Sequence, residues 1–263
     1  MIEKLRTLVW YLARPVFWQH LLALLWRTLN GAARQEDRYP ESLAWASGRA
    51  VSVADALKAV GLLSPGAALP APFPAERMAE AEARARHSKV EMGGPGDLDM
   101  IYHATGLSGA TRVIETGVAY GWSSLAILAA LEPKGGKLVS VDMPYPKLNN
   151  EAFVGIVVPG ESRDRWTLIR RPDRGGLKAA IAAFDGTIDL AHYDSDKSYD
   201  GRMFAYPLIW NALRPGGIFI SDDVSDNFGF RDWFEREGHA FAVSESGGRY
   251  VGIARKPGGD VAP

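Results

Sequence analysis

The spacing of hydrophobic residues changes along the chain and separates two kinds of segment. Up to residue 110, apolar residues recur at helical spacing and are broken by charged and proline-rich stretches. Beyond it, short apolar runs alternate with longer segments of helical spacing, an order that predicts strands and helices in turn. The predicted strands are Arg112–Glu115, Lys137–Asp142, Trp166–Arg170, Ile188–Asp194 and Gly217–Asp222.

Strands that alternate with helices predict a doubly wound α/β fold with a mostly parallel sheet. Two further apolar runs, 240–245 and 249–255, flank two adjacent glycines and predict an antiparallel hairpin at the sheet edge. We therefore expect a seven-stranded, Rossmann-like sheet with an antiparallel edge hairpin and an amino-terminal helical extension. The predicted helices of this part are Trp122–Leu131, Leu177–Phe184, a segment ending at Leu213, and 227–237.

The amino-terminal segment, residues 1–34, combines five basic residues, one acid and many aromatic and leucine side chains. Its longest uncharged run, Pro15–Trp26, is shorter than the roughly 20 residues that a membrane-spanning helix needs. Two interpretations follow. The segment is either a basic helix lying on a membrane surface, or a helix that packs on its own domain or on a second subunit of a homo-oligomer.

Turn-forming residues and composition divide the rest of the chain. Ser52 and Asp55 have the spacing of a helix start, and residues 64–74 hold four prolines, which is typical of a linker. We expect an extension and linker over 1–74, the main domain over 75–257 and a tail over 258–263.

The composition excludes several kinds of functional site. The 263 residues carry a net charge of −1 and no cysteine. The charge balance gives no electrostatic footprint for nucleic-acid binding. Without cysteine there is no disulfide, thiolate metal site or cysteine nucleophile, so a metal would need oxygen or imidazole ligands. We expect a cytoplasmic protein, with contact at the membrane periphery as the alternative for its amino-terminal segment.

The loop after the first predicted strand, Glu115-Thr-Gly-Val-Ala-Tyr-Gly121, has the composition of a ligand-binding turn. Gly117 permits a tight turn, and Gly121 allows a ligand to approach the backbone. The following helix start, with the hydroxyl of Ser123, offers donors to a carboxylate or phosphate. Asp142, at the end of the second strand, can accept hydrogen bonds from ribose hydroxyls. Together they predict a site for a nucleoside whose other end is a zwitterion.

Three carboxylates follow two later strands. Asp194 ends the fourth strand, and Asp222 with Asp223 ends the fifth. If these strands are neighbours, the three anions lie close together, and a divalent cation would keep them ionised. Oxygen ligands favour magnesium, with manganese and calcium as alternatives. The other interpretation is helix capping. His192 lies on a strand that we expect to be buried, which favours a core histidine over a ligand.

The glycine loop and the LVSVD strand resemble the cofactor motifs of class I S-adenosylmethionine-dependent methyltransferases, a likeness that covers about residues 90–255. It implies that Glu115, Gly117 and Ser123 contact the methionine end of that cofactor and Asp142 its ribose. Asp173 and Arg174 would then lie near the adenine.

The stretches DSDKSY and GGIFISDD resemble the metal-dependent O-methyltransferases of the catechol and caffeoyl-coenzyme A type. This resemblance implies a metal at Asp194, Asp222 and Asp223, and Lys197 as the catalytic base. Asp223 stands where those enzymes commonly carry asparagine, whereas related bacterial enzymes that methylate sugars carry two acids there. Many of those sugar-modifying relatives have histidine in place of Lys197.

The expected function is methyl transfer from S-adenosylmethionine to a hydroxyl of a small molecule, such as a sugar, with magnesium at the three aspartates. The lysine beside the metal is expected to shift toward neutrality, which suits a proton acceptor. Two alternatives stay open. One is a methyltransferase without metal, and the other is a non-catalytic protein that keeps the fold for interaction at a membrane surface.

Overall fold

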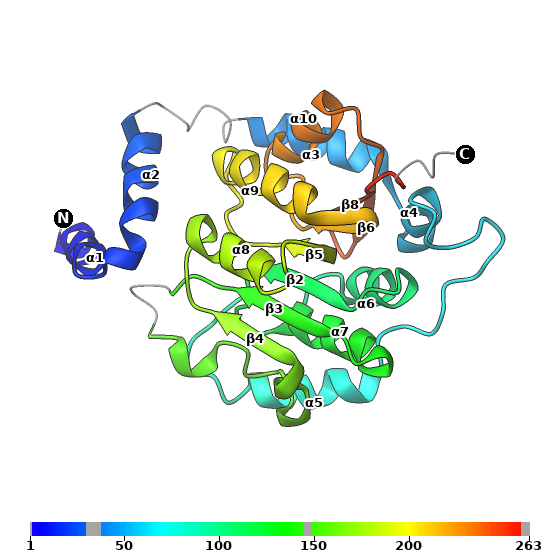
Figure 1. Ribbon diagram of the computed structural model, residues 1–263, viewed down its shortest axis with the longest axis horizontal. Coiled ribbons are helices and arrows are strands. Elements are labelled where there is room, and N and C mark those ends of the chain that lie inside the picture. The colour runs from blue at the N-terminus through cyan, green and yellow to red at the C-terminus, as the bar shows by residue number, and fades with distance from the viewer. Residues whose placement is uncertain (1, 30–37, 145–148, 259–263) are drawn as a thin grey trace.

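A mixed sheet forms the centre of the protein (Figure 1), as seen in a computed structural model that describes residues 2–29, 38–144 and 149–258. The strand order is β1-β7-β8-β6-β5-β2-β3-β4. In chain order the strands are β1 (Ala50–Val51), β2 (Arg112–Thr116), β3 (Lys137–Val141), β4 (Trp166–Ile169), β5 (Ile188–Tyr193), β6 (Leu213–Ser221), β7 (Phe241–Ser246) and β8 (Arg249–Arg255).

The pairing confirms the predicted fold class. Strands β2 to β6 are mutually parallel, and β8 runs antiparallel to both β6 and β7, so the closing hairpin lies where we predicted it. The predicted number of seven strands is wrong by one. Ala50 and Val51 add an eighth strand by pairing in parallel with Val243 and Ser244 of β7. A strand of two residues has no alternation that a sequence pattern can reveal.

Helices cover both faces of the sheet, except for the first two, which lie at the carboxyl ends of its parallel strands. The helices are α1 (Ile2–Leu12), α2 (Trp18–Leu29), α3 (Tyr39–Arg49), α4 (Val53–Ala59), α5 (Ala75–Ala85), α6 (Leu98–Leu107), α7 (Trp122–Leu131), α8 (Asp173–Ala182), α9 (Tyr199–Ala212) and α10 (Gly229–Arg236). Short 3₁₀ turns lie at Pro15–Phe17, Glu132–Lys134, Glu151–Phe153 and Gly160–Arg165. The predicted cap of α4 is confirmed, because the hydroxyl of Ser52 accepts the amide of Asp55.

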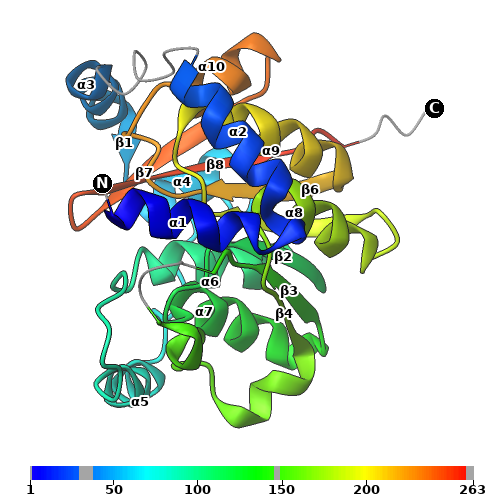
Figure 2. The same ribbon diagram turned by 90° about the vertical axis from the view of Figure 1, so that its left-hand side faces the viewer.

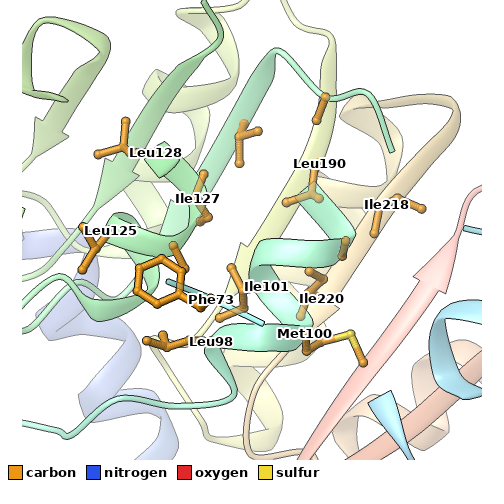
Figure 3. Packing of buried hydrophobic residues seen from close by; sticks show 14 of the residues in the cluster. Phe73, Leu98, Met100, Ile101, Leu125, Ile127, Leu128, Leu190, Ile218 and Ile220 are labelled. Carbon is orange, nitrogen blue, oxygen red and sulfur yellow. The ribbon is translucent and has the colours of Figure 1, made fainter. Parts of the chain in front are cut away.

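Alternation along the strands divides the core into two layers. Leu190 of β5 packs with α4 to α7 on one face, and the next residue, Ala191, packs with α8 to α10 on the other. Figure 3 shows the first layer, in which Ile101 of α6 and Ile127 of α7 lie over Leu190 and Ile218. Burial on both faces explains why these strands are continuous apolar runs in the sequence.

The carboxyl ends of β2, β3 and β5 lie at the same end of the sheet, because these strands are adjacent and parallel. Helices α1 and α2 lie against that end, at the left in Figure 1 and toward the viewer in Figure 2. No helix among the described residues is long and apolar enough to cross a bilayer. The turns that follow β2, β3 and β5 face α2, because His20 and Leu24 of that helix line the same cavity as residues of these turns.

Candidate functional site

A cleft with two connected chambers opens at the carboxyl edge of the sheet. Gly117, Asp142, Asp194 and Ser195 line both chambers. The first chamber is further lined by Met143, Pro172, Asp173, Arg174, Asp196, Gly201 and Phe204, with His20 and Leu24 of α2. The second adds Gly93, Gly94, Gly96, Ile101, Val118, Ala119, Trp122, Ser123, Lys197, Asp222 and Arg249.

The glycine loop is shaped by close backbone approach. Gly117 has a φ of +79°, and a Cβ placed on it would lie 1.9 Å from the carbonyl oxygen of Asp194. Only glycine fits there, because both the conformation and the space exclude a side chain. Gly121, with a φ of +91°, precedes α7, and Ser123 in the first turn lines the second chamber. Gly117 and Ser123 thus border the cleft, whereas Gly121 lines neither chamber, and a Cβ on it would lie 3.0 Å from Gly155 and Val158.

Asp142 lies at the point where the chambers meet. Its Oδ1 accepts the amide of Val118 at 3.0 Å, and its Oδ2 forms an ion pair with Arg170. Burial raises the pKa of Asp142, although the Val118 amide and the Arg170 guanidinium act in the opposite direction. The sequence analysis did not select Arg170, whose proximity to Asp142 follows only from the pairing of β3 with β4.

Glu115 lies behind the loop, fully buried within the sheet. Its Oε2 accepts hydrogen bonds from the hydroxyls of Ser124 at 2.5 Å and Ser140 at 2.6 Å. The indole of Trp166 donates to Ser140 in turn. Glu115 is absent from the lining of both chambers, so its immediate surroundings are structural. Its predicted contact with the cofactor stays a prediction.

The structure brings together the predicted acidic residues. Nζ of Lys197 lies 3.1 Å from Oδ1 of Asp194 and forms an ion pair with Asp223. Asp222 lies on the other side and contacts His192, a fully buried residue of β5, as its predicted core position requires. Burial and the charge of Asp222 raise the pKa of Asp194 to about 7.

Lys197 is held as a cation by its surroundings. Burial disfavours its charge, but the carboxylates of Asp194 and Asp223 outweigh burial and raise its pKa. We expected a neighbouring metal ion to lower the pKa of Lys197 toward neutrality, whereas the contacts with Asp194 and Asp223 raise this pKa. Within the described parts of the chain, no three Asp, Glu or His side chains converge in an arrangement that could hold a metal.

Comparison with protein families gives one match, to residues 114–224, with a family described as a methyltransferase domain. The matched segment begins in β2, ends just after Asp223 and includes the glycine loop, Asp142, Asp194 and Lys197. Over this segment, the chain is similar to methyltransferase domains. The match includes most residues that we selected from the sequence. Among curated proteins, none matches this chain.

Solved structures share the fold of this chain at low sequence identity. The SAH-bound methyltransferase PaMTH1 of Podospora anserina has a TM-score of 0.54 at 15% identity, covering 71% of this chain and 90% of its own. The SAM-bound O-methyltransferase TomG of Streptomyces achromogenes has a TM-score of 0.51 at 16% identity, with 70% and 92% covered. An O-methyltransferase of Bacillus cereus in complex with SAH has 0.52 at 13%, with 80% and 100% covered. These likenesses establish the fold.

Proposed function

We propose that this protein transfers a methyl group from S-adenosylmethionine to a hydroxyl of a small molecule. The observation that carries the proposal is the two-chambered cleft at the strand ends, where Gly117 and Asp142 adjoin Asp194 and Lys197. A nucleoside site and an acid–base cluster thus lie side by side. The matched methyltransferase domain and the SAM- and SAH-bound structures of the same fold support this assignment.

The cofactor is proposed to extend across both chambers. Asp142 would hold the ribose, and Gly117, Gly121 and Ser123, with Glu115 behind them, would position the methionine end. Asp173 and Arg174 line the first chamber, where the adenine would lie. This places the sulfonium near Asp194, since Asp194 and Gly117 line both chambers.

The reaction is an in-line displacement. The acceptor oxygen forms a bond to the methyl carbon, the carbon–sulfur bond breaks, and its electron pair stays on sulfur to give S-adenosylhomocysteine. The hydroxyl proton passes to a base, and most of the catalytic effect comes from positioning. Lys197 is the proposed base. It must first lose its proton, so the role requires Asp194 or Asp223 to withdraw from the ammonium.

A divalent cation, with magnesium as the proposed metal, would be held by the carboxylates of Asp194, Asp222 and Asp223, which would have to move closer together because they do not converge in the described structure. Oδ1 of Asp194 lies 3.1 Å from Nζ of Lys197, and Oδ1 of Asp222 lies 3.2 Å from Nε2 of His192, so a bound cation would have to replace these contacts. Such a cation lowers the pKa of a coordinated hydroxyl. Because Lys197 lies between Asp194 and Asp223, the cation and the ammonium would compete for the same carboxylates.

The ion pairs of Lys197 favour a second candidate, methyl transfer without metal. Here the ammonium itself occupies the acidic cluster and donates a hydrogen bond to the acceptor oxygen, which stabilises the charge that develops there. The hydroxyl proton then passes to the carboxylate of Asp194, whose pKa is raised to about 7 by burial and by the charge of Asp222. In both candidates the acceptor is proposed to be a small hydroxylated molecule such as a sugar. A non-catalytic role at a membrane surface is the remaining alternative, and it predicts that the cleft does not bind S-adenosylmethionine.

Titration calorimetry with S-adenosylmethionine, followed by a methyl-transfer assay on polyhydroxylated acceptors with and without chelator, tests these proposals. We expect the cofactor to bind and Asp142→Asn to weaken it. Loss of activity in chelator and in Asp222→Asn, with recovery by magnesium, would support the metal-dependent route. The matched control is Asp164→Asn, a change at an exposed carboxylate outside the cleft.

Activity that survives both chelator and Asp222→Asn would select the route without metal. No binding of S-adenosylmethionine at millimolar concentration would overturn the methyltransferase proposal itself. Thermal melting of each variant separates loss of the site from loss of the fold, since a bound ligand raises the melting temperature of a folded protein.

A further inference from the structure

Exposed apolar side chains gather on the amino-terminal helices. Of the large hydrophobic residues that are exposed in the described parts of the chain, eight belong to residues 8–26 and three lie elsewhere. Leu22 and Trp26 are 65% and 68% exposed, values that are unusual for side chains of this kind. We call this set the outer apolar face: Leu8, Val9, Leu12, Val16, Trp18, Leu22, Leu25 and Trp26.

Helix α2 has two separate sides. His20 and Leu24, four residues apart, point into the first chamber of the cleft. Trp18, Leu22 and Leu25 recur at a spacing of four and three, which places them together on another side of the same helix. That second side is exposed, so packing on the chain's own domain does not explain its composition. Figure 2 shows α1 and α2 lying across the front of the molecule, with no other described helix or strand over them.

Charge separates this segment from the rest of the chain. Residues 1–34 hold five basic residues and one acid, a net charge of +4, whereas the remaining residues hold 25 basic and 30 acidic, a net charge of −5. Arg14, at the junction of the two helices, is exposed, and the Cζ of its guanidinium lies 4.4 Å from the ring centroid of Trp10. A basic, aromatic and apolar element on an acidic body is complementary to an anionic surface with an apolar interior.

We propose that α1 and α2 bind the surface of an anionic phospholipid membrane, with the outer apolar face at the boundary between headgroups and acyl chains. No described helix can span the bilayer, so the helices would lie in its plane. The acidic body is repelled by the same surface, which fixes the orientation of the protein on it. This inference does not depend on what the cleft catalyses.

A second copy of the chain is the less suitable occupant. In a two-fold symmetric dimer the same patch meets itself, so two segments of net charge +4 would face each other. Like charges in contact oppose association. An anionic lipid surface removes this repulsion and attracts each basic residue that lies near it.

Co-sedimentation of the full chain with phospholipid vesicles tests the proposal. We expect binding to vesicles of phosphatidylcholine and phosphatidylglycerol at about 7:3, and weak binding to phosphatidylcholine alone. The double variant Leu22→Ser/Leu25→Ser should bind at least about tenfold more weakly than the parent, because apolar area drives insertion into the membrane surface. The matched control is Leu107→Ser, which removes an exposed leucine of α6 from outside the face. It should bind like the parent.

Three results would overturn the proposal: no binding to the anionic vesicles, equal binding by the double variant, or an equal loss in Leu107→Ser. Sedimentation velocity identifies the other occupant, since a parent dimer that Leu22→Ser/Leu25→Ser converts to monomer would assign the face to a second copy. Melting temperatures confirm that each variant folds, and the substituted side chains are exposed, so little change is expected.

Discussion

Nε2 of His192 lies 3.2 Å from Oδ1 of Asp222, and both side chains are almost wholly excluded from solvent. On the other side of the imidazole, Nδ1 lies 3.7 Å from Oε1 of Glu115. Burial disfavours a charged imidazole, but the two carboxylates outweigh it and raise the pKa of His192 to about 10. The contacts with Glu115 and Asp222 thus favour the protonated form of His192.

Replacing His192 with phenylalanine should destabilise the fold strongly. The change leaves Glu115 and Asp222 as buried carboxylates without their cation, a situation that costs about 3–5 kcal/mol. Urea unfolding at pH 7.5 measures the loss. In a Glu115→Gln background one of the two anions is already neutral, so the same substitution should cost less. Equal losses in the two backgrounds would show that the charge relationship is not what stabilises this part of the core.

A second prediction concerns Gly117. It distinguishes the cost of a left-handed backbone from the cost of a clash between a side chain and the neighbouring strand. Gly117 and Gly109 have similar φ values of +79° and +69°, but a Cβ would meet the Asp194 carbonyl at the first and nothing within 4 Å at the second. Gly109→Ala should cost about 1–2 kcal/mol, the strain of a left-handed alanine. Gly117→Ala should cost clearly more and displace Asp194.

Thermal unfolding of the two alanine variants gives the comparison, and binding of S-adenosylmethionine should be lost only in Gly117→Ala. If the two glycines tolerate alanine equally well, the close approach of β2 and β5 at this turn is not rigid. The comparison is internal, because both changes add the same methyl group to glycines of similar backbone conformation.

Much of the fold could be predicted from the sequence because strands that are buried on both faces consist of continuous runs of apolar residues. β2 to β8 all lie within a few residues of their predicted positions. Helix α6, in contrast, was missed. It begins at Leu98, directly after the glycines at 93, 94 and 96, which are typical of a loop, and its cap, Asp97, lacks the glutamate three residues on that marks a capping box.

The site was predictable only as far as residues follow their own strand. Gly117, Asp142, Asp194 and Asp222 each come directly after a strand, and strand order then places them together. Arg170 also follows a strand, β4, but its role is to pair with Asp142, and this contact depends on the pairing of β3 with β4. His20 lines the cleft from α2, whose position depends on tertiary packing, so no local pattern pointed to it. The ion pair of Lys197 with Asp223 likewise joins loops that follow different strands, and Asp223 has a φ of +52°, which is uncommon for residues other than glycine.

Arg170 should support cofactor binding through Asp142. Replacing it with glutamine removes the cation that opposes the burial of this carboxylate, so the pKa of Asp142 should rise further. A protonated Asp142 accepts fewer ribose hydrogen bonds. We expect the Kd for S-adenosylmethionine to rise, and to rise more near pH 6.5 than near pH 8.5, because protonation of this carboxyl increases as the pH falls.

Titration calorimetry at the two pH values checks this expectation, with Glu151→Gln as the control. Glu151 is the other partner of Arg170 and is largely exposed, so its removal leaves the contact with Asp142 in place. The affinity of this control should stay within about twofold of the parent, the scale expected for an exposed ion pair. A pH-independent loss in Arg170→Gln would instead indicate that the guanidinium contacts the cofactor directly.

Asp97 should make stability depend on pH in a direction opposite to that of most carboxylates. Its Oδ1 accepts the amide of Met100 at 3.0 Å at the start of α6, while its buried Oδ2 has no hydrogen bond from any described residue. Burial, with a smaller contribution from Asp222, raises the pKa of Asp97 to about 6. A carboxyl whose pKa is raised by folding stabilises the protein while protonated, and this contribution is lost as the pH rises through 6.

The Asp97→Asn variant tests this dependence, because an asparagine side chain does not ionise, keeps a capping oxygen and avoids the buried charge. We expect equal stability near pH 4 and an advantage for the variant that grows to about 1–3 kcal/mol above pH 7, since one pKa unit is about 1.4 kcal/mol. Urea unfolding across this range, without divalent cations, measures the difference. An advantage that is constant with pH would mean that the substitution improves the cap alone, whereas a loss at pH 8 would mean that the ionised carboxylate is needed in the fold.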